Sequence, residues 1–257
     1  MLKRIIAVAL PIILVATASA GALAQRGGQR GSGQRNINYD PGPQRAKYDG
    51  RWAFVRLRYG GMGRGGPEWA HDYPYGEQHF LQILKFVTNT DAREDMTQIL
   101  NLDDPEIFKY PIVYMAEPGY WTVTDQEATS FRAYLQKGGM VIFDDFHYAD
   151  WPYFEQTMKR VLPDAKIMDL DISNTLFHSF FDVPSFDVVH NMYDQGSPMF
   201  RGIYEDNDPK KRLMAIINYN TDISEYWEYS ASGFYPVSDT NQAYQIGVNW
   251  IIYGFTH

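Results

Sequence analysis

Two adjacent carboxylates, Asp144 and Asp145, directly follow the apolar run 140–143 and form the most informative polar pair in the sequence. Adjacent carboxylates repel one another, so a fold keeps them together only where a cation, a helix N-terminus or hydrogen bonds offset the repulsion. His147 lies two residues further on, and divalent cations accept carboxylates and imidazole as ligands. Asp144, Asp145 and His147 are therefore candidate metal ligands. Two alternatives stand beside this one: hydrogen bonding within the local turn, and general acid or base chemistry.

Two more residues are candidates for the same chemistry. Asp222 follows an expected strand, 213–219, and the sequence Asn-Thr-Asp there fits either an Asx turn or cap, or a further acidic group at the site. His178 lies beside apolar residues, which favours a buried histidine that belongs to the core. If the protein is catalytic, we expect Asp145, Asp222 and His178 to carry the reaction.

Asp72, Glu77 and His79 surround the start of an expected helix. Carboxylates near a helix N-terminus interact favourably with the helix dipole, which gives them a role without any ligand. We therefore interpret these three residues as structural.

The glycine-rich stretch 60–66 follows an expected strand and contains the Gly-x-Gly-x-x-Gly spacing of dinucleotide-binding loops. In those loops the third glycine opens a helix, whereas here Pro67 follows and the next helix is expected near Glu77. We predict a loop at the mouth of a pocket, and no cofactor other than a divalent cation. The sequence also lacks an HExxH motif, a GxSxG motif and a phosphate-binding loop, and without cysteine it has no thiol nucleophile.

Alternating strands and helices are expected to position these residues. Apolar runs bounded by turn residues predict strands at 52–59, 96–102, 111–116, 140–143, 165–170, 199–204 and 213–219. Helical spacing predicts helices over 77–90, from the capping box at Thr124 and Glu127 to Gly138, over 154–162 and around 243–250. This alternation is typical of a three-layer α/β fold, in which helices cover both faces of a mostly parallel sheet.

Ligands of such folds bind beyond the carboxyl ends of the strands. Three of these ends can be located, and their loops are expected to share one rim of the sheet: 60–66, 117–121 and 144–147. The rim holds aromatic and acidic side chains that suit a sugar face, a cation or a protein partner: Glu117, Tyr120, Trp121, Asp144, Asp145, His147 and Asp222. For the aromatic rings, simple packing over the core is the alternative.

The N-terminal sequence predicts export. Two basic residues, an apolar run and a small-x-small motif indicate a signal peptide over 1–24, with an uncleaved membrane anchor as the alternative. The Gly- and Arg-rich stretch 25–50 predicts a flexible linker, and 51–257 a single domain. The chain has no cysteine and a formal charge of -8, which excludes disulfides and argues against a nucleic-acid partner. We expect a periplasmic or secreted protein that meets a membrane only through an uncleaved signal segment.

The order and spacing of several short stretches resemble the DUF4159 family of uncharacterised bacterial proteins: Asp72-Tyr73-Pro74 with Glu77, 102–108, Tyr110-Pro111, 138–139, 144–146, 177–182, 200–203, 220–223, 247–249 and 256–257. The resemblance implies a flavodoxin-type fold similar to class I glutamine amidotransferases. Active members of that superfamily often use a cysteine that this chain lacks. The resemblance strengthens Asp144, Asp145 and Asp222 as site candidates. Relatives often continue with Gly-Asp-Gly-Trp-Glu where this chain reads 224–228, so Trp227 is retained and joins the candidate ligand-binding residues.

The sequence leaves the function open between different classes. The leading expectation is a non-catalytic module of the cell envelope that binds a small polar ligand, a cation or an envelope protein through the acidic and aromatic rim. The alternative is a hydrolase that needs no cysteine and acts on envelope material, with or without a metal ion. A purely structural role is a third interpretation.

Overall fold

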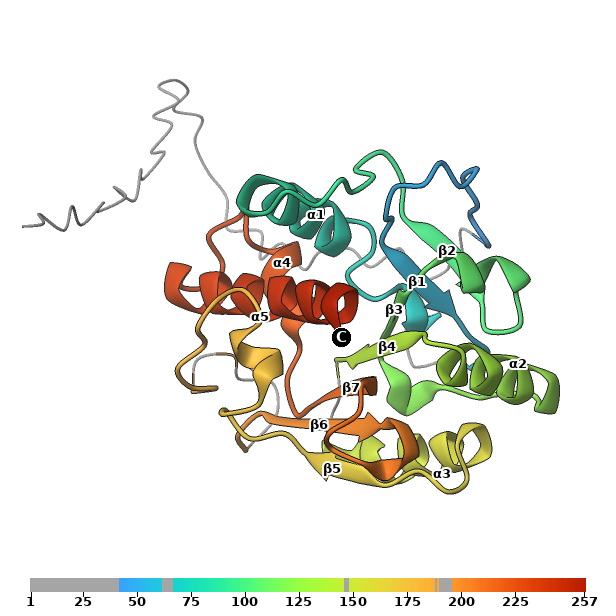
Figure 1. The fold of residues 1–257 in the computed structure, drawn as a ribbon. Coiled ribbons are helices and arrows are strands. Elements are labelled where there is room, and N and C mark those ends of the chain that lie inside the picture. The colour runs from blue at the N-terminus through green and yellow to red at the C-terminus, as the bar shows by residue number, and fades with distance from the viewer. Residues whose placement is uncertain (1–41, 62–66, 146–147, 188, 190–195) are drawn as a thin grey trace, which may run out of the picture. The chain divides into compact units, whose positions relative to one another are not determined.

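The computed structural model describes residues 42–61, 67–145, 148–187, 189 and 196–257 (Figure 1). All of them belong to the second of two compact units, Asn36–His257. The predicted signal peptide, most of the predicted linker, His147 and the glycines of the fingerprint after Gly61 lie outside the described residues. Within the described parts, no helix is long and apolar enough to cross a membrane.

Most predicted elements are present, with bounds that differ by a few residues. The strands are β1 (Val55–Arg58), β2 (Gln98–Asn101), β3 (Ile112–Ala116), β4 (Met140–Asp144), β5 (Ile167–Asp169), β6 (Met199–Tyr204) and β7 (Leu213–Tyr219). The α-helices are α1 (Tyr75–Val87), α2 (Asp125–Gln136), α3 (Trp151–Val161), α4 (Ile223–Glu228) and α5 (Val237–Thr256). The short helix α4 was not predicted.

The strands form one sheet in the order β2-β1-β3-β4-β7-β6-β5. The five strands from β2 to β7 in this order run parallel. At the other end of the order, β6 is antiparallel to both of its neighbours, β7 and β5. The central strands β3, β4 and β7 are buried along their whole length, as strands covered on both faces must be. The expected three-layer, mostly parallel α/β fold is confirmed.

Each face of the sheet has its own core, because successive side chains of a strand point to opposite faces. In β3, Ile112, Tyr114 and Ala116 pack in one core, and Val113 and Met115 pack in the other. The first core is closed by α1, α4 and α5, and the second by α2 and α3. Figure 1 shows these two groups of helices on opposite sides of the sheet.

Helix α2 begins where the sequence predicted. Thr124 accepts a hydrogen bond from the backbone N–H of Glu127, and the Glu127 side chain accepts one from the backbone N–H of Thr124. This reciprocal capping box satisfies two amide groups that the first helical turn leaves without partners. Gly138, with φ of 112°, adopts the left-handed conformation just after the helix ends.

The last residues of the predicted linker are part of the fold. Gln44 forms an antiparallel bridge with Ile99 of β2, with backbone N–O distances of 3.0 and 2.9 Å. Arg45 forms an ion pair with Asp104, and the carbonyl of Lys47 accepts a hydrogen bond from Arg93. Gln44 therefore pairs with the outer edge of β2, and Arg45 and Lys47 contact residues near it.

Candidate functional site

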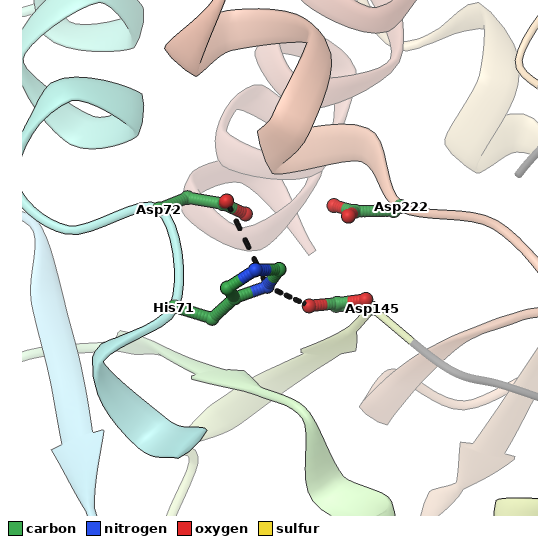
Figure 2. A group of neighbouring side chains, drawn as sticks. All are labelled: His71, Asp72, Asp145 and Asp222. Carbon is green, nitrogen blue, oxygen red and sulfur yellow. Dashed lines mark hydrogen bonds and ion pairs between the residues drawn. The ribbon is translucent and has the colours of Figure 1, made fainter. Parts of the chain in front are cut away.

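Loops at the carboxyl ends of three parallel strands bring together one imidazole and three carboxyl groups (Figure 2). His71 and Asp72 follow β1 and the short helix Glu68–Ala70, Asp145 follows β4, and Asp222 follows β7. Each residue offers one ligand atom, and these atoms all lie within 4.8 Å of one another. We call these four residues the His-Asp cluster. The loop after β3 adds Glu117, whose Oε1 lies 3.7 Å from Nδ1 of His71.

The imidazole of His71 lies between carboxylates. Its Nδ1 pairs with Oδ2 of Asp145 and lies 3.7 Å from Oδ1 of Asp72. Only 14% of the His71 side chain is exposed, and 1% of each of these two aspartates. Burial acts to lower the pKa of His71, but the charges of Asp72 and Asp145 outweigh it and raise that pKa well above its ordinary value. The cluster therefore stabilises a positive charge at its centre.

Asp222 has two roles in the structure. Its Oδ1 caps α4 by accepting a hydrogen bond of 3.0 Å from the backbone N–H of Glu225, as the sequence allowed. Figure 2 shows its carboxyl group facing that of Asp72. Burial, together with the charges of Asp145 and Asp72, raises the pKa of Asp222 well above its ordinary value. One imidazole thus does not compensate the negative charge that the fold gathers here.

The backbone is strained at the same strand ends. Asp72, Glu117, Asp145 and Asn220 all have left-handed backbone conformations, with φ of 61°, 47°, 63° and 58°. Such conformations cost about 1–3 kcal/mol for residues other than glycine, somewhat less for Asp and Asn, and they concentrate at functional sites. These conformations occur in the loops after four neighbouring strands. They lower the stability of the fold, and they set the directions of these side chains.

A fully buried arginine supports the loop that carries His71. Arg56 of β1 forms an ion pair with Glu77 of α1 and donates hydrogen bonds to the carbonyls of Trp69, at 2.9 Å, and His71, at 2.7 Å. Burial acts to lower the pKa of Arg56, and the Glu77 carboxylate outweighs it, so the guanidinium stays charged. The interpretation of Glu77 as a helix-dipole residue was incomplete, because its side chain is buried against Arg56.

Asp144 does not face the cluster. Its Oδ1 accepts hydrogen bonds from Nδ2 of Asn218, at 3.0 Å, and from the backbone N–H of Ile223, at 3.4 Å. Its Oδ2 accepts from the hydroxyl of Tyr114, at 2.9 Å, and from the backbone N–H of Ser224, at 3.0 Å. Burial raises its pKa to about 7 despite these donors. We therefore leave Asp144 out of the ligand set: it anchors the start of α4, and so places Asp222.

Replacing Tyr114 by phenylalanine tests this anchoring role. The change removes a hydroxyl that lies within hydrogen-bonding distance of both Asp144 and Ser224, in a fully buried position. We expect a loss of about 1.5–3 kcal/mol in the free energy of unfolding, measured by urea denaturation, because the acceptor is a buried carboxyl group. Tyr153→Phe is the control, since Tyr153 is 67% exposed and should change stability by less than about 0.5 kcal/mol. Equal effects of the two variants would contradict the role of Tyr114.

The predicted aromatic residues of the rim are mainly core residues. Trp121 is 2% exposed and packs against Phe143, with 5.7 Å between ring centroids. Trp227 is 1% exposed and stacks on Phe80 at 4.4 Å. Tyr120 is partly buried against the same core as Trp121. The packing alternative therefore describes both tryptophans, and neither offers a ring face to a ligand.

His178 is not among the residues of the cluster, and the expectation that it is buried is wrong. Its side chain is 37% exposed; Nδ1 pairs with Asp182 at 2.5 Å and Nε2 with the carbonyl of Ile172 at 2.7 Å. The hydrogen bond to Ile172 and the one to Asp182 raise the pKa of His178. His147 lies outside the described residues, so the structure does not place it.

Sequence reasoning missed His71 as a candidate and assigned Asp72 only a structural role. The stretch Asp72-Tyr73-Pro74 belongs to the pattern that resembles the DUF4159 family, so the signal for Asp72 was present but was interpreted as a helix start. For His71 the only signal was its position beside Asp72, shortly after the glycine-rich stretch 60–66 that follows the first expected strand.

Two comparisons with known proteins bear on this site. A search of curated proteins found no significant match. A scan against protein families matched residues 53–255 to the family described as "Domain of unknown function (DUF4159)". The match covers every strand of the sheet described above and all four residues of the His-Asp cluster. The chain therefore belongs to the DUF4159 family.

Proposed function

We propose that this domain binds a divalent cation through His71, Asp72, Asp145 and Asp222. The observation that carries the proposal is the approach of four potential ligand atoms, from three separate loops, to within 4.8 Å of one another. Oδ1 of Asp72 adds support: it is buried, it accepts no hydrogen bond from the part of the chain that the structure describes, and the His71 imidazole lies 3.7 Å away, beyond hydrogen-bonding distance. A buried carboxylate oxygen in this state is costly unless a cation or another donor satisfies it.

The charges of the cluster support the same conclusion. Three buried carboxyl groups face a single imidazole, and burial together with the charges of Asp145 and Asp72 raises the pKa of Asp222, which favours its protonation. A dication would replace these protons, because a metal ligand must be deprotonated and the ion then supplies the opposing charge. His71 would bind through Nδ1, the atom that already lies among the carboxylates.

The donor set favours particular ions. One imidazole nitrogen and three carboxylate oxygens suit Mn²⁺ or Zn²⁺. Ca²⁺ takes six to eight oxygen ligands, and Mg²⁺ binds few protein groups and keeps much of its water. We therefore propose Mn²⁺ or Zn²⁺ as the ion, in a domain that the predicted signal peptide exports to the periplasm or the medium.

Thermal unfolding with added metal tests the proposal directly. At about a hundredfold excess over the dissociation constant, Mn²⁺ or Zn²⁺ should stabilise the protein by about 2.7 kcal/mol, or about 5–11 °C, and EDTA should reverse the shift. Asp145→Asn should remove the shift, because an amide is a poor substitute for a charged ligand. Asp182→Asn is the matched control, since Asp182 also pairs with a histidine but at the surface. No shift with any of the divalent ions, or one that survives Asp145→Asn, would overturn the proposal.

A second candidate is a metal-assisted hydrolase, and Glu228 favours it. This half-buried residue ends α4, and burial with the nearby charge of Asp72 raises its pKa to about 8. A carboxyl group that is protonated near neutral pH beside a metal site suits general acid catalysis. Turnover of p-nitrophenyl esters or phosphates that requires the metal and is lost in Glu228→Gln would favour the hydrolase. Metal binding without such turnover would favour the non-catalytic module.

A further inference from the structure

The two outer edges of the sheet differ. At β2 the outward backbone N–H and C=O of Ile99 are paired by Gln44, in the segment that precedes β1. The opposite edge is β5 (Figure 1), and no strand or isolated bridge of the described residues lies on its outer side. An uncovered edge is a template for another extended chain. The β5 edge is therefore where this sheet can accept a further strand.

The backbone of β5 presents both donors and acceptors on this outer side. Leu170, just after β5, donates a backbone hydrogen bond of 2.8 Å to the carbonyl of Phe200 in β6. Residues of an antiparallel strand alternate between bonding to the neighbouring strand and pointing away from it, so Ile167 and Asp169 direct their N–H and C=O groups outward. None of these four groups has a hydrogen-bond partner within the described residues. An extended backbone matches this alternation of donors and acceptors.

A groove lies beside the open edge, between β5 and α3. Its volume is about 630 Å³, and the partly exposed apolar side chains of Ala165 and Ile167 contribute to its lining. Successive side chains of a strand point to opposite faces of the sheet. A strand added to β5 would therefore direct every second side chain toward the face that carries Ile167, where the groove can receive it.

The groove has a positive charge in an acidic protein. Its charged lining residues are Glu155, Lys159, Lys166, Asp169 and Arg201, whereas the whole chain carries a formal charge of -8. Nε of Arg201 lies 3.0 Å from Oδ1 of Asp169, and Nζ of Lys159 lies 3.7 Å from Oε1 of Glu155. The exposed ammonium of Lys166 has no carboxylate partner within the described residues. The groove therefore favours a ligand that supplies a carboxylate.

We propose that β5 binds an extended peptide segment of a separate protein by strand addition, with a carboxylate side chain of the peptide facing Lys166. A small molecule would leave the outward backbone groups of Ile167 and Asp169 without partners. A second copy of this chain would bring the same excess of basic side chains to the contact, and like charges repel. This inference is independent of the proposed cation site, because no residue of the His-Asp cluster lines the groove.

Fluorescence anisotropy with labelled heptapeptides tests the proposal, in the presence of EDTA so that the cation site does not contribute. Alternate positions of these peptides carry valine, glutamate, lysine or serine in all combinations. We expect saturable binding of peptides that combine valine with glutamate, and weaker binding where lysine replaces glutamate. Methylating the backbone nitrogens along one edge of the tightest peptide removes its donors, and should weaken binding about tenfold or more.

Asp169→Pro and Asp169→Ala form a matched pair of variants. Both remove the ion pair with Arg201, but only proline also removes the outward N–H. Edge strands tolerate a proline whose nitrogen faces solvent, so both variants should fold. Asp169→Pro should bind the tightest peptide about tenfold more weakly than Asp169→Ala does. Lys166→Ser should weaken glutamate peptides about fivefold, whereas Lys210→Ser, at an exposed lysine outside the groove, should have no effect.

Several outcomes would overturn the assignment. These are no saturable binding of any peptide, binding that backbone methylation leaves intact, and equal binding by Asp169→Pro and Asp169→Ala. A dimer of the parent protein that Asp169→Pro dissociates would assign the edge to a second copy of the chain instead. Because the methylated peptides are tested on the parent protein, their result does not depend on the folding of any variant.

Discussion

Replacing Arg56 by methionine is expected to destabilise the domain by about 3–5 kcal/mol, the range observed when one partner of a buried ion pair is removed. The change leaves the Glu77 carboxylate buried without its cation and removes the donors of the Trp69 and His71 carbonyls. It also removes a guanidinium that lies 5.1 Å from the ring centroid of Tyr114. Guanidinium chloride denaturation measures the loss. Because the His71 backbone loses its anchor, metal affinity should fall as well.

Two further variants separate the charge effect from general damage. In Arg56→Met/Glu77→Leu both buried charges are absent, and much of the lost stability should return, since apolar replacement of a whole buried pair is often nearly neutral. Arg201→Met is the matched control: Arg201 stacks on Trp151 and pairs with the largely exposed Asp169, so its loss should cost about 1 kcal/mol or less. If Arg56→Met cost no more than Arg201→Met, the assigned role of Arg56 would be wrong.

Asp222→Asn is expected to act in opposite directions on stability and on metal binding. In EDTA the variant should be more stable than the parent, because it removes a buried carboxyl group whose neighbours Asp145 and Asp72 disfavour its ionisation. Asparagine is also a good N-cap, so α4 keeps its first hydrogen bond. The metal-dependent shift of the midpoint should nevertheless disappear. Thermal unfolding with and without Mn²⁺ or Zn²⁺ gives both results in one experiment.

The pH dependence of the stability difference between Asp222→Asn and the parent protein tests the same electrostatic explanation. A carboxyl whose pKa is higher in the folded than in the unfolded state costs no stability below the unfolded value, near 3.9, and an increasing amount as pH rises above it toward the folded value. Each unit of difference corresponds to about 1.4 kcal/mol. The advantage of Asp222→Asn in EDTA should therefore be clear at neutral pH and should vanish near pH 4. A variant that is less stable than the parent at neutral pH would contradict the electrostatic account of the cluster.

The sequence predicted the scaffold well, because each element leaves a local signal. The run 111–116 and the capping box at Thr124 each predicted an element that the structure contains. Helix α4 was missed because six residues hold too little periodicity, and because its stability comes from Asp222 and Asp144 at its start. The antiparallel pairing of β6 with β7 and with β5 was also beyond local patterns, since it depends on the path of the chain between these strands.

The candidate site was predicted only in part. Asp145 and Asp222 lie after apolar strands, so the rule for strand ends found them. The same rule also made Asp144 a candidate ligand, because no local pattern shows which of two adjacent carboxylates faces the His-Asp cluster. Arg56 was missed for a related reason: an arginine in a strand is usually exposed, and only its contact with Glu77, twenty-one residues later, makes it a core residue.

The bridge between Gln44 and Ile99 determines which N-terminal truncations of this domain leave the outer edge of β2 covered. β2 is the last strand on its side of the sheet, and the outward backbone N–H and C=O of Ile99 are paired by Gln44, in the segment that precedes β1. A fragment that starts at Arg51 would lack this segment and would expose the backbone of Ile99 to solvent. Open strand edges recruit strands from other molecules, so such a fragment is prone to self-association, whereas one that starts before Gly42 keeps its edge covered.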